Sequence, residues 1–343
     1  MKKLLNTLYV MTEDCYLTLE GENVVVLQEE KTLGRFPLHN LEHIVCFTYK
    51  GASPALMGAC AERNVWLSFF SPRGKFLARS IGKEYGNVLL RKEQYRISDN
   101  EERSHCYARN MIIGKIYNGR WSVERTLRDH KMRVNEDELR LVSVALQKAL
   151  EDCKNSNDLR QLRGIEGKAA EQYFSILDEL ILNQKEDFFF ENRNRRPPQD
   201  NMNALLSFSY TILAGECANA LTSVGLDSYV GFMHRDRPGR RSLALDLMEE
   251  LRPVLADRFA LTLVNMKTIK AGHFDKQQDG TILLTDEGRK VFFAAWQSRK
   301  KETITHPFLG EKIEWGLVPH VQALLLARTI RGDLEEYPPF LWK

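Results

Sequence analysis

The pattern of apolar residues changes near residue 97, and this change divides the chain into two structural regions. Before it, short segments rich in β-branched and aromatic residues, such as NVVVLQ and VWLSFFS, alternate with turn residues as β-strands do. After it, apolar residues recur at spacings of three and four over long stretches, which is typical of amphipathic helices. The sequence therefore predicts an α+β protein, in which a small N-terminal β-sandwich or β-roll domain (1–96) precedes a larger, mainly α-helical domain (97–343).

One helix is expected within the β-rich region, at 54–63, because Pro54 suits a first helical turn and Ser53 can cap it. A short charged segment, 91–96, is expected to link the two domains. A β-like insertion is expected at 273–285. The helices expected in the second domain cover 99–118, 136–153, 158–183, 203–224, 242–270, 286–301 and 316–331.

The composition narrows the class of protein. A chain with 43% hydrophobic and 28% charged residues is typical of a soluble globular protein, and no apolar run approaches the ~20 residues of a membrane span. Its six cysteines form no C-x-x-C pair, so we expect neither a zinc knuckle nor a redox dithiol, but the reduced thiols of a cytoplasmic protein. The net charge of +3 permits nucleic-acid binding, for which local clusters must provide the argument.

A histidine and three carboxylates follow one another in the segment GFMHRDRPGRRSLALDLMEELR (231–252). His234 precedes a helix that Ser242 can cap. Residues three and four apart share a helix face, so the acidic residues of this helix are expected to lie side by side and to repel one another. They are Asp246, Glu249 and Glu250. A divalent cation with His234 as a further ligand would compensate them, and a solvated acidic face balanced by nearby arginines is the alternative.

A glutamate outside this segment completes the candidate site. In LRGIEGKAAEQYF, Glu166 is bracketed by Gly164 and Gly167. Because glycine costs a helix interior about 1 kcal/mol relative to alanine, the pair suggests a helix boundary or a close backbone approach that points the carboxylate into a crevice. An ordinary surface glutamate at a helix start is the alternative. With His234 and Glu249, it would form a hard, open donor set suited to Mg²⁺ or Mn²⁺.

Two arginine-rich loops flank the acidic residues and suggest an anionic substrate. They contain Arg193, Arg195 and Arg196 in the first loop, and Arg235, Arg237, Arg240 and Arg241 in the second. Ion pairs with the acidic helix are the alternative role for each. The apolar helix that follows the first loop carries Asn203, Ser207 and Tyr210 near its start. These polar groups either bond to neighbouring helices or line the site.

Three motifs occur in a fixed order, namely LRGIEGKAAEQYF, RPPQDNMNALLSFSY and GLDSYVGFMHRDRPGRRSLALDLMEELRP. Together they resemble the CRISPR-associated adaptation integrase–endonuclease, the universal Cas-one family. The resemblance covers essentially the whole chain. The tail GDLEEYPPFLWK and the motif LALDLMEELRP look most like the subtype I-C branch.

The resemblance implies a homodimeric, metal-dependent DNA endonuclease and integrase. Such an enzyme inserts new spacers into a CRISPR array by attack of DNA 3′-hydroxyls on phosphodiesters at the repeat boundary. Its expected partners are double-stranded DNA (spacer precursor and CRISPR repeat) and a dimer of the small Cas-two subunit, and the involvement of a Cas-four-type nuclease is left open. The β-rich domain is expected to provide dimer and partner contacts.

The family's site residues are carried over to this chain one by one. The glutamate of the I-E-G motif falls on Glu166, and the histidine of the G-F-x-H motif falls on His234. The two acidic positions of the following helix fall on Asp246 and Glu249, the second of which is often aspartate in relatives. The resemblance thus implies catalysis by Glu166, His234 and Glu249, with Mg²⁺ or Mn²⁺ as cofactor. Asp246 would be a nearby fourth metal ligand, and Tyr210 and the arginines would bind DNA.

Two other classes of function are compatible with these residues. The chain is either the integrase, a non-catalytic DNA-binding assembly scaffold, or a hydrolase of small phosphoesters. A scaffold does not need a bound cation that depends on His234. A small phosphoester does not need arginine clusters on both sides of the site.

Overall fold

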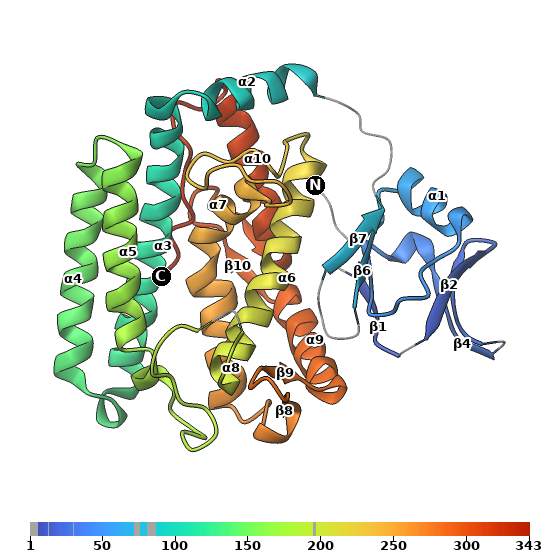
Figure 1. The fold of residues 1–343 in the computed structure, drawn as a ribbon. Helices are drawn as coiled ribbons and strands as arrows, with labels where there is room; N and C mark the ends of the chain where they lie inside the picture. Colours follow the sequence, from blue (N-terminus) through green and yellow to red (C-terminus); the bar gives the residue numbers. More distant parts are fainter. Residues whose placement is uncertain (1–5, 13, 30, 72–75, 81–86, 195–196) are drawn as a thin grey trace. The chain divides into compact units, whose positions relative to one another are not determined.

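The computed structural model describes residues 6–343 with the exception of 13, 30, 72–75, 81–86 and 195–196. The chain forms two compact units, each of which gathers segments that are distant in the sequence (Figure 1). The first contains Met1–Tyr85, Leu284–Glu302 and Glu314–Leu317, and the second contains Gly86–Leu283, Thr303–Ile313 and Val318–Lys343. Within the described residues, no helix has both the length and the apolar character that crossing a membrane requires.

Two β-sheets form the frame of the first unit. Their strands are β1 (Thr7–Val10), β2 (Cys15–Glu20), β3 (Asn23–Gln28), β4 (Lys31–Pro37), β5 (His43–Cys46), β6 (Trp66–Phe70) and β7 (Phe76–Ser80). One sheet has the order β1-β5-β6-β7, in which β1, β5 and β6 are parallel and β7 is antiparallel to β6. The antiparallel sheet β2-β3-β4 shares one buried apolar cluster with it. The β-rich first domain that the sequence predicts is therefore confirmed.

Helix α1 (Pro54–Glu62) connects the parallel strands β5 and β6. Ser53 Oγ accepts a hydrogen bond from the backbone N–H of Leu56 at 3.2 Å, and Pro54 occupies the first turn, as predicted. Parallel strands need a crossover connection, which α1 provides while burying Leu56 and Cys60 in the common core. The expected sandwich or roll thus contains a βαβ unit, which strand-like sequence patterns alone do not reveal.

Helix α9 (Asp286–Lys301) belongs to the first unit although it comes late in the sequence. Its Phe293 ring stacks on Tyr9 of β1, with ring centroids 4.1 Å apart, and lies 5.4 Å from the ring of Phe47. The helix has the bounds that the sequence predicts. The sequence prediction, which divides the chain after residue 96, placed this helix in the second domain. The order of elements in the chain could not reveal its aromatic contacts with β1.

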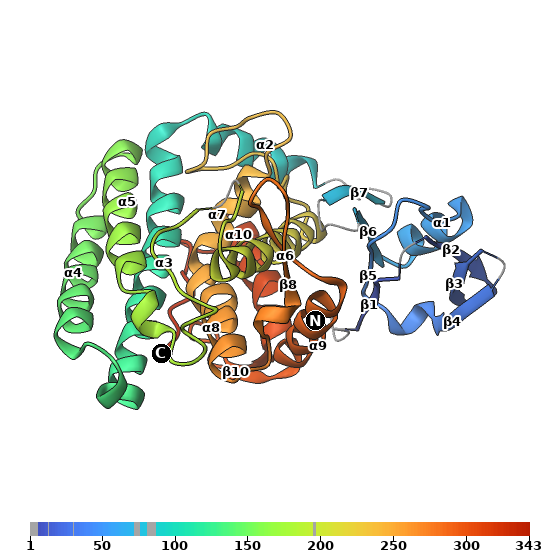
Figure 2. The same cartoon turned by 60° about the horizontal axis from the view of Figure 1, so that its bottom comes forward.

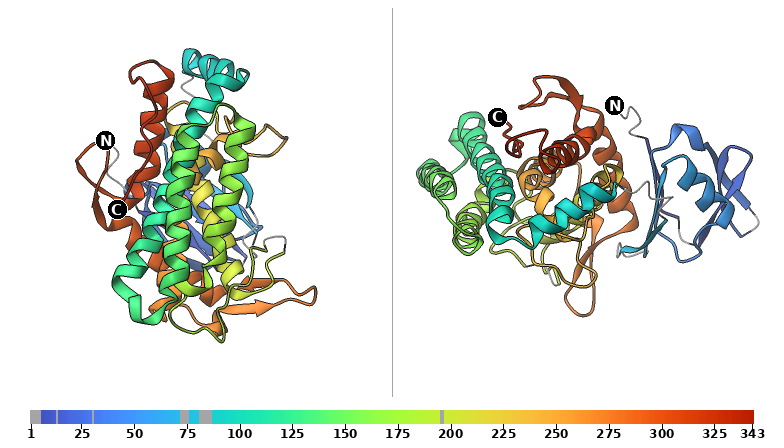
Figure 3. Two further views of the ribbon diagram at one scale, coloured as in Figure 1. Left: turned by 90° about the vertical axis from the view of Figure 1, so that its left-hand side faces the viewer. Right: turned by 90° about the horizontal axis from the view of Figure 1, so that it is seen from above.

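The second unit is mainly helical, as predicted. Its helices are α2 (Val88–Ser98), α3 (Glu101–His130), α4 (Glu136–Lys154), α5 (Leu159–Ser175), α6 (Asn201–Ser223), α7 (Ser242–Leu251), α8 (Arg258–Asn265) and α10 (Val318–Ile330). Helices α3, α4 and α5 lie side by side (Figure 3), and α7 lies between α3 and α6 (Figures 1 and 2). Because α7 is enclosed in this way, most of its side chains are buried, including its carboxylates.

Short strand pairs occur late in the chain. Strands β8 (Phe274–Lys276) and β9 (Ile282–Leu284) form the β-like insertion that the sequence predicts. Gly280 lies in the turn between them with φ of +81°, a conformation that favours glycine. Strands β10 (Thr303–Thr305) and β11 (Lys312–Glu314) form a second pair that the sequence analysis did not predict.

Several helices differ from the sequence prediction. Helix α3 continues to His130 beyond the predicted end at 118, and α5 ends at Ser175 before the predicted end at 183. Residues 91–96, expected to link the two domains, are part of helix α2. The single helix expected at 242–270 is instead α7, a π-helical turn (Arg252–Asp257) and α8. Pro253 explains the interruption, because it has no N–H to donate to the carbonyl group one turn earlier.

Candidate active site

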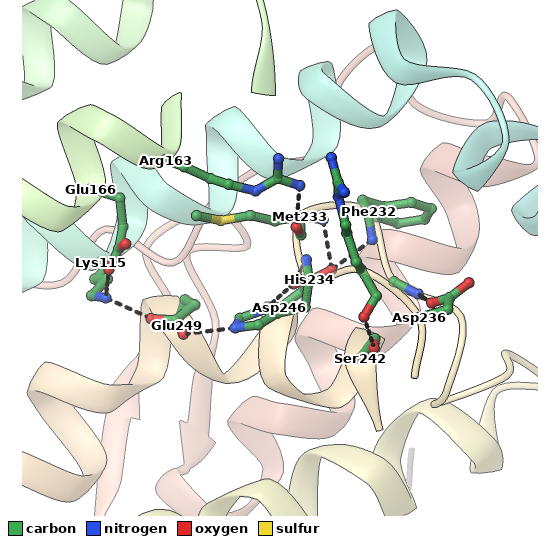
Figure 4. Close-up of polar contacts among 12 residues, drawn as sticks. Lys115, Arg163, Glu166, Phe232, Met233, His234, Asp236, Ser242, Asp246 and Glu249 are labelled. Atoms are coloured by element: carbon green, nitrogen blue, oxygen red, sulfur yellow. Dashed lines mark hydrogen bonds and ion pairs between the residues drawn. The ribbon is translucent and has the colours of Figure 1, made fainter. Parts of the chain in front are cut away.

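The loop that precedes α7 is folded around the carboxylate of Asp246 (Figure 4). Asp246 is only 1% exposed, and it accepts hydrogen bonds from the backbone N–H groups of Phe232, Met233 and His234 at 2.6, 3.0 and 3.0 Å. Its Oδ1 also lies 2.5 Å from Nδ1 of His234. A carboxylate in this position fixes the imidazole ring and directs its other nitrogen away. That nitrogen, Nε2, lies 4.0 Å from Oε1 of Glu249.

Gly231 allows this loop to approach α7. A Cβ atom at Gly231 would lie 2.8 Å from Oδ2 of Asp246 and 2.8 Å from Cβ of Ser242, which is closer than real Cβ atoms come. The sequence suggested that Ser242 is the N-cap of α7. It is instead the first residue of the helix, and Arg241 holds the cap position. The Ser242 hydroxyl instead donates a hydrogen bond to the carbonyl oxygen of Arg235 at 3.2 Å. This bond ties the arginine-rich turn to the helix.

A lysine from α3 lies between Glu166 and Glu249, the two carboxylates predicted to be catalytic (Figure 4). Lys115 Nζ forms an ion pair with Oε1 of Glu166 in α5 and lies 2.8 Å from Oε2 of Glu249 in α7. The other carboxylate oxygen of Glu249 is 3.2 Å from Nη2 of Arg252. Because 22% of the Glu166 side chain is exposed but only 4% of the Glu249 side chain, the cluster meets solvent at its Glu166 side.

The basic neighbours keep the Glu249 carboxylate ionised. Burial alone would raise the pKa of Glu249, but Arg252 and Lys115 outweigh burial and lower this pKa to about 2. Burial likewise lowers the pKa of Lys115, but Glu249 and Glu166 outweigh it, so that the pKa of this lysine is raised. The buried charges therefore depend on one another, and removing either sign leaves the other without compensation.

The sequence suggested that the acidic residues of α7 lie side by side and repel one another, but in the structure they face different surroundings. The first two face the loop and the basic cluster described above, and the third, Glu250, faces another part of the protein. Its Oε1 accepts hydrogen bonds from Nε2 of Gln322 at 2.9 Å and from the hydroxyl of Tyr337, and its Oε2 accepts one from the N–H of Phe340 at 2.7 Å. Glu250 thus binds the C-terminal tail and is not part of the candidate site.

Gly164 and Gly167 do not have the role that the sequence suggested. Both lie within α5, and a Cβ atom at either would meet nothing within 4 Å. They mark neither a helix boundary nor a close backbone approach. Glu166 reaches Lys115 because helices α3 and α5 pack side by side.

Arg193 is half-buried and bonded to protein partners. Its guanidinium group donates hydrogen bonds to Oδ1 of Asn203 at 2.6 Å and to Oγ of Ser207 at 3.0 Å. The same group lies 5.3 Å from the ring of Tyr210. For Asn203 and Ser207, these contacts therefore show bonding to protein partners.

The other predicted DNA-binding arginines differ in their exposure. Arg235 and Arg237 are exposed, whereas Arg240 and Arg241 are half-buried. Arg195 and Arg196 lie outside the described residues. The turn before α7 therefore presents basic side chains to solvent beside His234.

A small cavity of about 40 Å³ adjoins the acidic and basic cluster, and Lys115, Glu166 and Tyr210 contribute to its lining. The Tyr210 hydroxyl donates a hydrogen bond to Oδ1 of Asp257 at 2.5 Å. Burial raises the pKa of Asp257 to about 6, although this hydrogen bond and Arg252 act in the opposite direction. The cavity thus brings Tyr210, predicted to orient DNA, to the side of the site where Glu166 lies.

Comparison with known protein families shows to which family the chain belongs. The family model described as CRISPR associated protein Cas1 matches residues 8–298. The chain belongs to the Cas1 family. It is 46% identical to CRISPR-associated endonuclease Cas1 1 of Chlorobaculum tepidum and 48% identical to CRISPR-associated endonuclease Cas1 2 of Rhodospirillum rubrum, in each case over 100% of both chains. It is also 34% identical to a CRISPR-associated exonuclease Cas4/endonuclease Cas1 fusion of Geobacter sulfurreducens, over 97% of this chain and 60% of that protein.

Solved structures share the fold of this Cas1-family chain. A casposase bound to integration product has a TM-score of 0.83 at 21% identity, over 98% of this chain and 93% of the casposase. A Cas1 protein from Thermotoga maritima has a TM-score of 0.80 at 23% identity, over 96% of this chain and 97% of the other. A chain of a Cas6-RT-Cas1–Cas2 complex has a TM-score of 0.81 at 23% identity, over 100% of this chain and 36% of that chain.

The donor set of this Cas1-family chain suits a hard divalent cation. Glu166 and Glu249 offer carboxylate oxygens and His234 offers an imidazole nitrogen. Oε2 of Glu249 is buried and lies 2.8 Å from the Lys115 ammonium group, so a positive charge already sits at this carboxylate oxygen. Among the described residues, no three His, Cys, Asp or Glu side chains lie close enough together to hold a metal ion as they stand. The ammonium group of Lys115 lies between two of the proposed ligands instead.

Sequence reasoning missed the basic residues of the site. Lys115 follows Met111 and Ile112 at spacings of four and three, so a lysine lies beside the buried face of α3, where charged residues are rare. A lysine at such a position could have indicated a buried ion pair. Arg252 lies three residues after Glu249 on the same turn of chain, a spacing at which opposite charges commonly pair.

Proposed function

We propose that this chain is the metal-dependent DNA endonuclease and integrase of a CRISPR adaptation system, of a type most like subtype I-C. The observation that carries the proposal is the convergence of Glu166, His234 and Glu249 from three separate segments on one basic cluster. Relatives of nearly half-identical sequence and the same length carry the name CRISPR-associated endonuclease, which supports the nuclease activity. The fold shared with a casposase bound to integration product supports the integrase activity.

Glu166, His234 and Glu249 are the residues proposed to hold Mg²⁺ or Mn²⁺. When bound, the cation would supply Lewis-acid chemistry by neutralising charge on the phosphoryl and leaving oxygens. Asp246 holds the imidazole through Nδ1 and leaves Nε2 for the ligand role. Both oxygens of Asp246 already accept hydrogen bonds, so we assign it the positioning of His234 in place of the fourth ligand role that the sequence suggested.

The proposed reaction is a pair of transesterifications. A 3′-hydroxyl of the incoming DNA attacks a phosphodiester at the repeat boundary, so that a new P–O bond forms and the bond to the repeat's own 3′-oxygen breaks. The proton of the attacking hydroxyl is lost, and the leaving 3′-oxygen takes up a proton. Water in place of the hydroxyl gives hydrolysis. Arginines of the turn before α7 hold the DNA backbone, and Tyr210, fixed by Asp257, lies beside the reacting strand.

The proposed partners follow from the same family. They are double-stranded DNA, a second copy of this chain, and a dimer of the small Cas2 subunit, since a structure of similar fold belongs to a Cas1–Cas2 complex. A Cas4-type nuclease is a further partner, since one relative is a fusion of the two proteins. Among the described residues of the β-rich first unit, no group of His, Cys, Asp or Glu side chains could hold a metal ion, so we assign the contacts between copies to this unit.

Strand transfer into supercoiled plasmid tests this function. The reaction contains a plasmid with a CRISPR repeat, short duplex DNA with free 3′-hydroxyls, the Cas2 subunit, and either Mn²⁺ or EDTA. We expect joining that requires Mn²⁺ and is lost in His234→Ala but retained in His39→Ala, which removes an exposed histidine of the first unit. Joining that persists in His234→Ala would move the active site elsewhere. Absence of joining in the wild type would favour the scaffold.

The affinity for duplex DNA is expected to fall steeply as salt rises, because bound arginines release counterions from the phosphates. Replacing Arg237 with alanine should lower the slope of log affinity against log salt by about 1. Fluorescence anisotropy over a salt series measures this slope. Arg140→Ala removes the same charge from the exposed face of α4 and is the matched control. Equal slopes for both variants would remove Arg237 from the DNA interface.

A further inference from the structure

Lys115 is an unusual residue for its position in α3. Only 15% of its side chain is exposed, and its ammonium group ends between carboxylates that belong to two other helices. A buried ammonium group is strongly unfavourable unless opposite charges compensate it. The Lys115 charge therefore stabilises the fold only because Glu166 and Glu249 flank it, and they in turn depend on Lys115.

Within the cluster, two basic groups already face the two glutamates. Glu166 and Glu249 each contribute a negative charge, and Lys115 and Arg252 each contribute a positive charge. A divalent cation bound between the glutamates would add two positive charges directly beside Lys115 and Arg252, in a mostly buried site. Like charges at such short distances repel strongly where the dielectric constant is low. One basic group must therefore move away when a cation binds.

Of the two basic groups, Lys115 is the one placed where the cation would bind. Its Nζ contacts one oxygen of each glutamate, whereas Arg252 contacts only Glu249. The Arg252 guanidinium also lies 5.0 Å from the ring of Tyr210, which holds it in place. The lysine ends in a flexible four-carbon stem, and the cavity of about 40 Å³ that it lines gives the ammonium group room to shift.

We infer that Lys115 is a built-in competitor of the catalytic cation. Its ammonium group lies between Glu166 and Glu249 and must withdraw when Mg²⁺ or Mn²⁺ binds there. The inference rests on the proposed function, because it takes these two glutamates as cation ligands. It goes further by naming the group of the protein that the cation must displace.

DNA binding and cation binding are coupled through the same lysine. A phosphate of bound DNA offers the displaced ammonium group a new anionic partner, so DNA favours the state in which the cation is bound. Coupling of this kind is reciprocal, so the cation must raise the affinity for DNA by the same factor. The protein would then bind its cation weakly until DNA is present.

Isothermal titration of Mn²⁺ into DNA-free protein tests the inference. We expect Lys115→Met to bind Mn²⁺ at least about tenfold more tightly than the wild type, within the range typical of coupled sites. Without metal, the same variant should unfold at a lower temperature than the wild type, because two carboxylates lose their compensation. Lys115→Gln, which keeps a polar head group, is expected to change the Mn²⁺ affinity in the same direction and serves if the methionine variant does not fold. Lys168→Met removes an exposed lysine of α5 and is the control.

The outcomes separate this inference from the proposed function. Mn²⁺ binding that is lost in His234→Ala, but is unchanged or weaker in both Lys115 variants, would overturn only the role of Lys115. Mn²⁺ binding that persists in His234→Ala would contradict the proposed site itself, and the inference with it. A lower unfolding temperature without metal, together with tighter Mn²⁺ binding, supports competition, because a purely structural lysine would weaken both properties.

Discussion

Glu166→Gln is expected to lower the rate of strand transfer on the order of a thousandfold while the protein remains folded. Glutamine keeps the size of the side chain but removes the anionic oxygen proposed to bind the cation. A catalytic cation stabilises the transition state by several kcal/mol, and each ~1.4 kcal/mol corresponds to a factor of ten in rate. Lys115 loses one of its two carboxylate partners, so the unfolding temperature should fall, but the side chain is partly exposed and Lys115 retains Glu249, so the protein should stay folded.

Single-turnover joining of labelled DNA measures this loss, and thermal unfolding of the same sample measures the fold. Glu171→Gln, which changes an exposed glutamate of the same helix, is the matched control and should join DNA at the wild-type rate. DNA affinity measured without metal should be similar for both variants. A Glu166→Gln variant that joins DNA at the normal rate would remove this residue from the cation site.

Glu250→Ala, in contrast to Glu166→Gln, is expected to act mainly on the fold and to cause a large loss of stability. Glu250 is fully buried and accepts hydrogen bonds from Gln322, Tyr337 and the N–H of Phe340. Alanine leaves the Tyr337 hydroxyl and the Phe340 N–H without this acceptor, at about 1–3 kcal/mol each, whereas Gln322 keeps the Tyr337 hydroxyl and the Pro338 carbonyl oxygen as partners. We therefore expect the free energy of unfolding to fall by about 3–5 kcal/mol, the range of the most damaging single substitutions. Urea denaturation measures this change.

Glu250→Gln provides both the control and a pH signature. Burial raises the pKa of Glu250 to about 7, against the hydrogen bonds from Tyr337 and Gln322. A raised pKa means that the folded protein binds a proton that the unfolded chain releases. The contribution of Glu250 to stability is therefore complete below its ordinary pKa of 4.5 and is lost as the pH rises through about 7. The glutamine variant should lose this part of the pH dependence, and an unchanged profile would contradict the assignment.

The sequence predicted the local features of the fold well. The cap of α1 at Ser53, the bounds of α9, and the hairpin at 273–285 depend on residues within a few positions of one another, so a short window contains the information. The parallel pairing of β1, β5 and β6 depends on contacts between distant segments. The π-helical turn after α7 combines a local cause, Pro253, with packing that the sequence does not display.

For the candidate site, the sequence motifs predicted residues that the structure brings together, but not how they are held. Glu166, His234 and Glu249 lie around one basic cluster. A Cβ atom at either glycine beside Glu166 would meet nothing, and spacing along α7 could not show that Asp246 faces a loop while Glu250 faces the tail. Lys115 was missed because its partners lie 51 and 134 positions away in the chain. Such charge pairing is a property of the tertiary structure.

The neighbouring glutamates of α7 set a limit on how the chain can change in length. Successive residues of an α-helix point about 100° apart, so Glu249 faces the basic cluster and Glu250 faces the tail. Gly114 brings α3 so close that a Cβ atom there would lie 2.7 Å from Cβ of Glu250. A one-residue insertion or deletion early in α7 would turn both side chains by about 100°, away from their present partners. A change of length should therefore disturb folding less in the exposed turn 235–239 than within the helix, where one codon gained or lost would disable catalysis and folding together.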